Sequence, residues 1–150
     1  MSIRVIGINH KTAPVSIREQ VAFSPDGLND ILKSINEDIT ANNNNDEVVI
    51  LSTCNRTEIY TSSDYSLDKI CSWMCHQNKL SKDDVQKHLY DYSDETAIQH
   101  IMRVASGLDS LVLGEPQILG QLKSALKTSR QQRRASYLVL VDHFSLFHQQ

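Results

Sequence analysis

The sequence predicts an α+β sandwich, in which a sheet of adjacent strands packs against helices. Apolar runs rich in β-forming residues alternate with amphipathic stretches, in the order strand, helix, strand, strand, helix, helix, strand, helix, helix. Two strands follow one another almost directly, which favours helices on one face of the sheet over a doubly wound parallel sheet. No G-x-G-x-x-G pattern indicates a dinucleotide site, since Gly114 and Gly120 belong to no phosphate-binding loop.

The first half of the chain is expected to contribute a strand, a helix and a pair of strands. Residues 3–8 are mostly apolar and predict a strand inside the sheet, and residues 9–14 predict a loop. Ser24-Pro25-Asp26 offers a capping hydroxyl, a proline at the first helical position and an early acid, so a helix starts there. After a polar turn at residues 42–46, strands are predicted over residues 48–51 and 57–61. The helix carries its apolar stripe on Leu28, Ile31, Leu32, Ile35 and Ile39.

The second half is expected to be mostly helical. Ser81 followed by Asp84 resembles a capping box for a short helix, and residues 89–92 predict the last strand. Ser93 caps the next helix, and Gly114-Glu115-Pro116 opens the final one. The apolar faces of the longer helices in this half are Leu67, Ile70, Cys71 and Met74, then Ala97, Ile98, Ile101, Ala105 and Leu108, then Ile118, Leu119, Leu122 and Leu126.

Composition limits the possible functions. A chain of 150 residues with 40% hydrophobic and 22% charged residues suits one globular domain with a real core. No apolar run approaches the roughly 20 residues needed to cross a bilayer, and the start lacks a signal-peptide pattern. Three cysteines, an odd number, argue against a disulfide framework and favour the cytoplasm. The net charge of −3 argues against general nucleic-acid coating but allows one partner held by a local basic patch.

Cys54 is the strongest candidate for chemistry. It follows an apolar strand, and Arg56 lies two residues further on, among the small polar residues Thr53 and Asn55. A thiol beside a guanidinium is more easily ionised, and the thiolate is the nucleophilic form. This pattern indicates a covalent catalyst that acts on an acidic or acyl substrate. The alternative is that Cys54 is a small buried hydrophobic residue.

Other candidates have plainer explanations beside the functional ones. A metal site could be suggested by Cys71, Cys75 and His76. However, the two cysteines share the apolar stripe of a helix, and no fourth ligand follows. We therefore expect these residues to pack in the core, and no metal is predicted. His100 is expected at the rim of an apolar helix face, where it could pack or transfer protons. His10 follows the first strand, and the sequence does not show whether it comes near Cys54.

A polar set is predicted at the start of the last helix, after an unusual apolar connection. Glu115, Gln117 and Gln121 could simply form a solvated helix face. Residues 107–114 are mostly apolar, so this connection is expected to be buried and to hold Ser110 and Glu115 against the domain.

Together these stretches resemble a known family, glutamyl-tRNA reductase. The resemblance rests on three long motifs in the right order, and it covers about residues 3–129. They are Gly7-Ile8-Asn9-His10-Lys11-Thr12-Ala13-Pro14, then Leu51-Ser52-Thr53-Cys54-Asn55-Arg56-Thr57-Glu58, then residues 102–110 continuing through Gly114-Glu115-Pro116-Gln117-Ile118-Leu119-Gly120-Gln121.

The resemblance implies a mechanism and a fold. Cys54 would attack the ester carbonyl of glutamyl-tRNA to form a thioester, which NADPH would reduce to glutamate-1-semialdehyde for tetrapyrrole (haem) biosynthesis. Arg56 would pair with the substrate carboxylate, and His100 would be a second catalytic residue that polarises or donates a proton. The fold would be ferredoxin-like, an antiparallel sheet packed with helices and followed by a C-terminal helix. The remaining substrate-binding residues would be Thr53, Asn55, Ser110, Glu115, Pro116, Gln117 and Gln121.

The chain also departs from the family pattern. Residues 1–129 read as the N-terminal catalytic domain, whereas residues 130–150 form an atypical tail that suggests a truncated or frame-shifted product. The NADPH-binding and dimerisation domains of the family do not fit in this length, so the chain alone is expected not to complete the reduction. Family partners would be glutamyl-tRNA, a second copy and the next enzyme, glutamate-1-semialdehyde aminomutase. The alternatives are a non-catalytic module that binds tRNA or a partner, with Lys123, Lys127, Arg130, Arg133 and Arg134 as a basic strip, and an unrelated thiol hydrolase.

Overall fold

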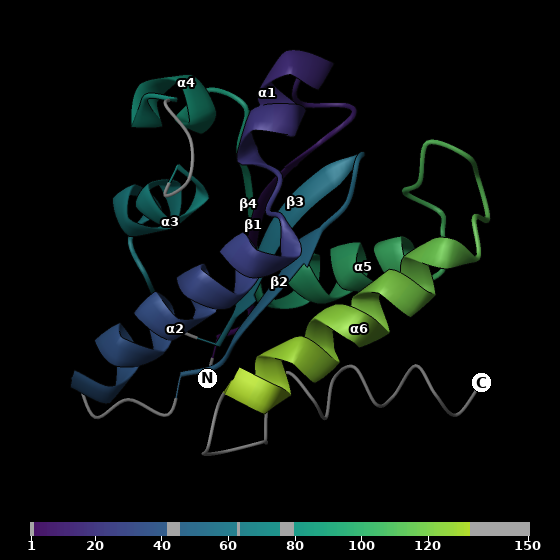
Figure 1. The fold of residues 1–150 in the computed structure, drawn as a ribbon. Helices are drawn as coiled ribbons and strands as arrows, with labels where there is room; N and C mark the ends of the chain where they lie inside the picture. The colour runs from purple at the N-terminus through teal and green to yellow at the C-terminus, as the bar shows by residue number, and fades with distance from the viewer. Residues whose placement is uncertain (1, 42–45, 63, 76–79, 133–150) are drawn as a thin grey trace.

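A four-stranded antiparallel sheet forms the centre of the protein (Figure 1). The computed structural model describes residues 2–41, 46–62, 64–75 and 80–132. The strands β1 (Arg4–Asn9), β2 (Val48–Ser52), β3 (Arg56–Thr61) and β4 (Tyr90–Ser93) lie in the order β2-β3-β1-β4. This order confirms the predicted ferredoxin-like α+β class. β1 pairs with β3 from Arg4 opposite Thr61 to Asn9 opposite Arg56, so the end of β1 lies beside the start of β3.

Six helices surround the sheet in the described part of the chain, and their starts follow the capping signals in the sequence. They are α1 (Val15–Val21), α2 (Pro25–Ala41), α3 (Leu67–Met74), α4 (Lys82–Gln86), α5 (Asp94–Ala105) and α6 (Gln117–Gln132). Ser81 Oγ accepts from the backbone N–H of Asp84 at 3.2 Å, and Ser93 forms a capping box with Thr96 at the start of α5. The prediction omitted α1, because Val21 is its one fully buried residue and so its apolar periodicity is weak.

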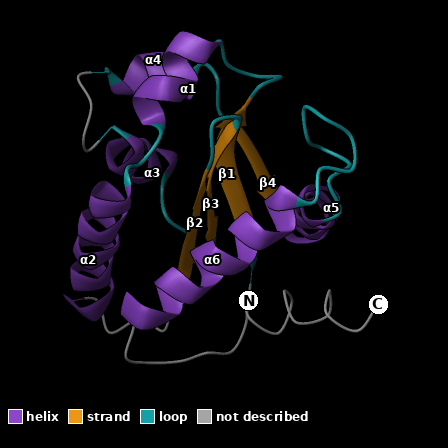
Figure 2. Cartoon of the chain, turned by 45° about the vertical axis from the view of Figure 1, so that its right-hand side comes forward, coloured by secondary structure: helices purple, strands orange, loops and turns teal. Residues whose placement is uncertain are grey.

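Helices cover both faces of the sheet, so the prediction that they lie on one face is wrong (Figure 2). Neighbouring residues of the central strands face opposite cores: Val5 packs into one cluster, and Ile6 into the other. Continuous apolar runs are typical of strands buried on both sides, and β1 and β2 both show them. The first core contains residues of α5 and α6, and the second contains residues of α1, α2, α3 and α4.

The last helix of the described residues, α6, packs across β2, the strand at one edge of the sheet. Ile118 and Leu122 are buried in the core that this helix shares with α5, and Ser129 Oγ donates a hydrogen bond to the backbone carbonyl of Val48. The predicted boundary between residues 129 and 130 falls inside α6, and the rest of the tail, including the apolar residues 137–141, lies outside the described residues.

Candidate active site

Cys54 lies on the tight turn that joins β2 to β3, and its side chain is exposed. The backbone N–H of Thr53 donates to the carbonyl of Arg56 at 2.8 Å, which closes the turn. Thr53 Oγ1 accepts from the N–H groups of Asn55 and Arg56, both at 3.2 Å. A hydroxyl that satisfies two backbone donors fixes the turn, so the thiol is presented to solvent from a rigid frame.

The thiol opens into a small cavity of about 50 Å³ between this turn and the start of α6. Two apolar residues, Leu111 and Ile118, also line it, and neither was predicted to belong to the site. Most of the predicted site is assembled here, whereas Pro116 and His100 are not among the lining residues. The polar lining consists of Thr53, Cys54, Asn55, Arg56, Ser110, Glu115, Gln117 and Gln121.

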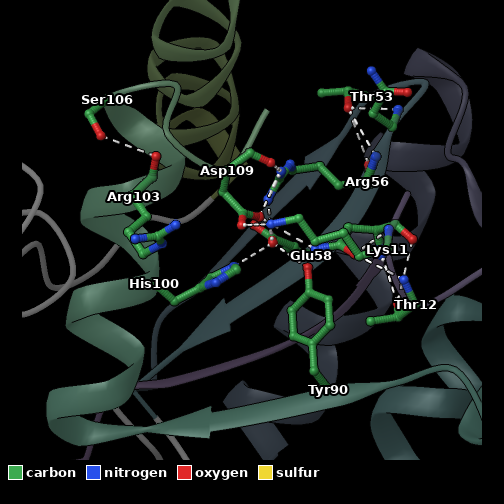
Figure 3. A network of polar contacts seen from close by, with 12 residues as sticks. Lys11, Thr12, Thr53, Arg56, Glu58, Tyr90, His100, Arg103, Ser106 and Asp109 are labelled. Carbon is green, nitrogen blue, oxygen red and sulfur yellow. Dashed lines mark hydrogen bonds and ion pairs between the residues drawn. The ribbon is translucent and has the colours of Figure 1, made fainter. Parts of the chain in front are cut away.

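Arg56 reaches the cavity from a buried position and is held by two acidic residues (Figure 3). Its Nη1 donates to Glu58 Oε1 at 3.0 Å, and its Nη2 donates to the carboxylate and the carbonyl oxygen of Asp109 at 3.0 and 2.6 Å. Burial alone would lower the pKa of Arg56, but the charge of Glu58, the neighbouring tyrosines and the hydrogen bond to Asp109 together outweigh this effect and raise it. The guanidinium therefore stays charged inside its buried ion pairs with Glu58 and Asp109.

Glu58 is the centre of this buried network, and it was not among the predicted site residues. Its side chain is inaccessible to solvent and accepts hydrogen bonds from Arg56, His100 and the hydroxyls of Tyr60 and Tyr90. Burial would raise the pKa of Glu58, but the hydrogen bond from His100 and the charge of Arg56 hold it below its ordinary value. The residue follows Arg56 by two positions in a β-rich run, a pattern that gives no sign of a buried carboxylate.

His100 differs from its predicted placement at the rim of α5. The residue is 8% exposed, its Nε2 lies 2.7 Å from Glu58 Oε1, and its ring packs against Tyr90 and Tyr92. Glu58 Oε1 also accepts from Arg56 and Tyr90, so Nε2 is the protonated, donating nitrogen. His100 is connected to the cavity through Glu58 and Arg56.

His10 is at the same end of the sheet as Cys54, because Asn9 pairs with Arg56 in the β1–β3 register. Its Nδ1 is buried and has no hydrogen-bond partner among the described residues. Burial lowers the pKa of His10, and the nearby positive charges of Arg56 and Lys11 lower it further. The sequence placed this residue only at the end of a strand.

The connection before α6 is exposed, so the prediction that it is buried is wrong. Leu111, Val112 and Leu113 are 62%, 66% and 74% exposed. The side chain that is buried in this connection is instead that of the charged Asp109, which pairs with Arg56. Ser110 and Glu115 still lie against the domain, as expected, because they line the cavity.

The remaining cysteines are packing residues. Cys71 is buried in α3, Cys75 is half-buried, and burial raises the pKa of both thiols. His76 lies outside the described residues. Within the described ranges, no three potential metal-ligating side chains come together, and none of the helices there is both long and apolar enough to span a bilayer.

Comparison with known proteins identifies the family. The family model described as "Glutamyl-tRNAGlu reductase, N-terminal domain" matches residues 6–145. This chain belongs to that family. The match continues past Arg130, so it includes most of the tail that the sequence analysis set apart; the predicted boundary at residue 129 remains a prediction.

Proteins named glutamyl-tRNA reductase are similar to most of the chain. The protein of Marinomonas sp. (strain MWYL1) is 50% identical over 133 residues, which are 87% of this chain and 31% of that protein. Those of Shewanella sp. (strain W3-18-1) and Shewanella putrefaciens are each 50% identical over 131 residues, covering 87% of this chain and 30% of their own length. The chain therefore spans about a third of these relatives.

A solved structure of the same family shares the fold. The glutamyl-tRNA reductase from Methanopyrus kandleri superposes with a TM-score of 0.65 at 25% sequence identity, covering 89% of this chain and 29% of that one.

The described residues do not fit the NADPH that the family resemblance implies. Dinucleotides bind at a glycine-rich turn between a parallel strand and a helix, and every strand pair in the described part of the chain is antiparallel. The two longest helices, α2 and α6, each follow another helix in the chain and not a strand.

Proposed function

We propose that this chain performs the acyl-transfer step of glutamyl-tRNA reduction, in which Cys54 accepts the glutamyl group. The observation that carries the proposal is the exposed thiol of Cys54, held on a fixed turn and opening into a cavity with polar walls. The family supports this role, because its members are named for glutamyl-tRNA.

The step conserves atoms and electrons. Cys54 Sγ, as the thiolate, forms a bond to the ester carbonyl carbon of glutamyl-tRNA, and the bond from that carbon to the ribose oxygen breaks. The ribose oxygen leaves with the proton released by the thiol. The products are a glutamyl thioester on Cys54 and free tRNA.

The cavity offers complementary groups for a glutamyl residue. Arg56 lines the cavity, and its positive charge suits the side-chain carboxylate, although Glu58 and Asp109 already bind its Nη1 and Nη2 atoms. Glu115 offers a carboxylate for the ammonium group. The amides of Gln117 and Gln121 and the hydroxyl of Ser110 add hydrogen-bonding groups along α6 and the preceding loop. His100 contributes through Glu58, which holds Arg56 in place.

We assign the later steps to parts of the enzyme outside the described residues. In this proposal the full enzyme reduces the thioester to glutamate-1-semialdehyde with NADPH, for tetrapyrrole biosynthesis in the cytoplasm, and the three free cysteines favour such a reducing compartment. Dimerisation and contact with the aminomutase of the next step rest on the resemblance alone. The 150-residue chain is expected to load the glutamyl group without reducing it.

The proposal is tested by incubating the chain with glutamyl-tRNA and measuring its intact mass. The expected result is one glutamyl adduct that hydroxylamine removes, that Cys54→Ser abolishes and that the matched variant Cys75→Ser keeps. An adduct that survives Cys54→Ser, or no adduct on the wild-type chain, would contradict the assignment. Semialdehyde formed by the chain alone with NADPH would refute the expectation that it does not reduce the thioester.

A second candidate is binding of tRNA without transfer. Lys123, Lys127 and Arg130 are exposed and lie three and four residues apart, on one face of the helix that begins beside the cavity. Such a strip would bind phosphates, and its affinity would fall steeply with salt. Salt-dependent tRNA binding with no adduct on Cys54 would favour this function over acyl transfer.

A further inference from the structure

Asp109 forms several buried contacts and has no role of its own in the proposed transfer of the glutamyl group to Cys54. Its Oδ1 accepts from Lys11 Nζ at 2.8 Å, and its Oδ2 accepts from Arg56 Nη2 at 3.0 Å and from Asn9 Nδ2 at 3.4 Å. Its carbonyl oxygen accepts from Arg56 Nη2 at 2.6 Å. One buried residue therefore joins the end of β1, the loop after it and the start of β3 (Figure 3).

Asp109 belongs to a loop of residues 107–114 that closes on itself. The N–H of Gly114 donates to the carbonyl of Gly107 at 3.0 Å, and both glycines have left-handed backbones, with φ of +74° and +75°. A side chain at Gly107 would bring its Cβ within 3.0 Å of Gly114 and of the Glu115 nitrogen. The geometry of this loop is therefore set by its closing glycines.

Apolar burial contributes little to holding this loop on the domain. Leu108, Leu111, Val112 and Leu113 are all at least half exposed, so their transfer from water is incomplete. Asp109 is the buried polar anchor between them. The hydrogen bonds and ion pairs of its carboxylate tie the loop to Lys11 and Arg56, and its backbone carbonyl accepts one further hydrogen bond from Arg56.

The two residues that follow Asp109 line the cavity of Cys54. Ser110 and Leu111 come directly after the anchor, and Glu115 follows the closing glycine. We propose that Asp109 is a positioning residue for acyl transfer: by binding Lys11 and Arg56 together, it holds the 107–114 loop against the Cys54 turn and thereby shapes the glutamyl pocket. This inference rests on the proposed function.

The chemistry of Asp109 explains why a carboxylate is required. Lysine and arginine side chains are donors without acceptors, so a residue that binds both through separate oxygens needs two acceptors. An asparagine offers one oxygen and turns its NH2 group toward one of the two cations. Burial would raise the pKa of the Asp109 carboxyl, but the hydrogen bonds from Lys11 and Arg56 hold it below its ordinary range, so the group is charged at neutral pH.

The test compares Asp109→Asn with Asp109→Glu, Lys11→Gln and a matched control, Asp91→Asn, in the 150-residue chain. Asp91 also pairs with an arginine, at 2.6 Å from Arg4, but on β4 and away from the cavity. Three rates are measured: glutamyl transfer to Cys54 at saturating glutamyl-tRNA, alkylation of Cys54 by iodoacetamide, and amide exchange of residues 110–114.

We expect Asp109→Asn to slow transfer roughly 10- to 100-fold at saturating substrate, because a misplaced pocket group lowers the rate of the step itself. Alkylation and loop exchange should become faster as the loop opens. Asp109→Glu, which keeps both oxygens, should recover part of the transfer rate. Lys11→Gln removes an exposed partner and should give a smaller effect in the same direction, and Asp91→Asn should match the wild type.

Wild-type transfer, alkylation and exchange rates in a folded Asp109→Asn variant would overturn the inference. If Asp109→Asn does not fold, Lys11→Gln decides: unchanged loop exchange in that variant would also overturn it. If the wild-type chain transfers no glutamyl group, the proposed function fails. The amide exchange of residues 110–114 in Asp109→Asn then still shows whether Asp109 holds the loop.

Discussion

Neutralising Glu58 should destabilise the protein strongly. Glu58→Gln keeps the size of the side chain but removes the negative charge that faces Arg56 at 3.0 Å in a site without solvent access. Removing one partner of a buried ion pair costs about 3–5 kcal/mol. Asp109 still faces the guanidinium in the variant, so we expect a loss near the lower end, about 3 kcal/mol, which raises the unfolding equilibrium constant roughly 100-fold.

The same variant has a predicted pH signature. The folded-state pKa of Glu58 lies below its unfolded value of about 4.3, so its contribution is complete above that pH and is lost as the pH falls through the folded pKa. The stability difference between wild type and Glu58→Gln should therefore be largest at pH 7 and shrink below about pH 4.

Urea titrations followed by circular dichroism at a series of pH values measure this difference. Glu37→Gln, on the exposed face of α2, is the control and should change stability by less than about 0.5 kcal/mol. A Glu58→Gln variant within about 1 kcal/mol of wild type at pH 7, or a difference that does not change on acidification, would refute the reasoning, because a buried paired carboxylate requires both effects.

Two further predictions concern thiol reactivity and the packing of the central strands. Iodoacetamide should label Cys54 faster than Cys71 and Cys75, because Cys54 is exposed while burial raises the pKa of the other two thiols; peptide mass spectrometry at short times measures this, and equal rates would contradict it. Gly7→Ala should lower the free energy of unfolding in urea by about 1–3 kcal/mol, because the new Cβ would lie 2.6 Å from the Thr57 carbonyl oxygen. Gly120→Ala has open space around it and should raise the free energy of unfolding by up to about 1 kcal/mol, because alanine favours the helix. A Gly7→Ala variant more stable than Gly120→Ala would exclude overpacking at Gly7.

Local signals in the sequence predicted most of the elements. The capping hydroxyls of Ser81 and Ser93 and the proline at the start of α2 located three helices, because these signals act within one turn. The turn at Cys54 was also predictable, since it lies between two runs of β-forming residues. Seven other residues predicted from the sequence motifs line the same cavity as Cys54.

The buried network of ion pairs could not be predicted from local sequence signals. Arg56 and Asp109 are 53 residues apart, and Glu58 and His100 are 42 apart, so the sheet register and the packing of α5 bring them together. An isolated glutamate or aspartate in the sequence indicates exposure, because carboxylates are rarely buried unless paired. The 107–114 loop differs from its prediction for the same reason. Its apolar composition predicts that its leucines are buried, whereas the buried side chain is that of Asp109, which forms an ion pair.

The contact between α6 and β2 also affects aggregation. β2 is an edge strand with the apolar sequence Val48-Val49-Ile50-Leu51, which would be a template for pairing with other chains if its edge were open. α6 lies across this strand, and Ser129 occupies the carbonyl of Val48. We therefore expect that a cut or unfolding event that releases α6 would open the edge of β2 to pairing with other chains. In that case α6 limits self-association and also supplies Gln117 and Gln121 to the cavity.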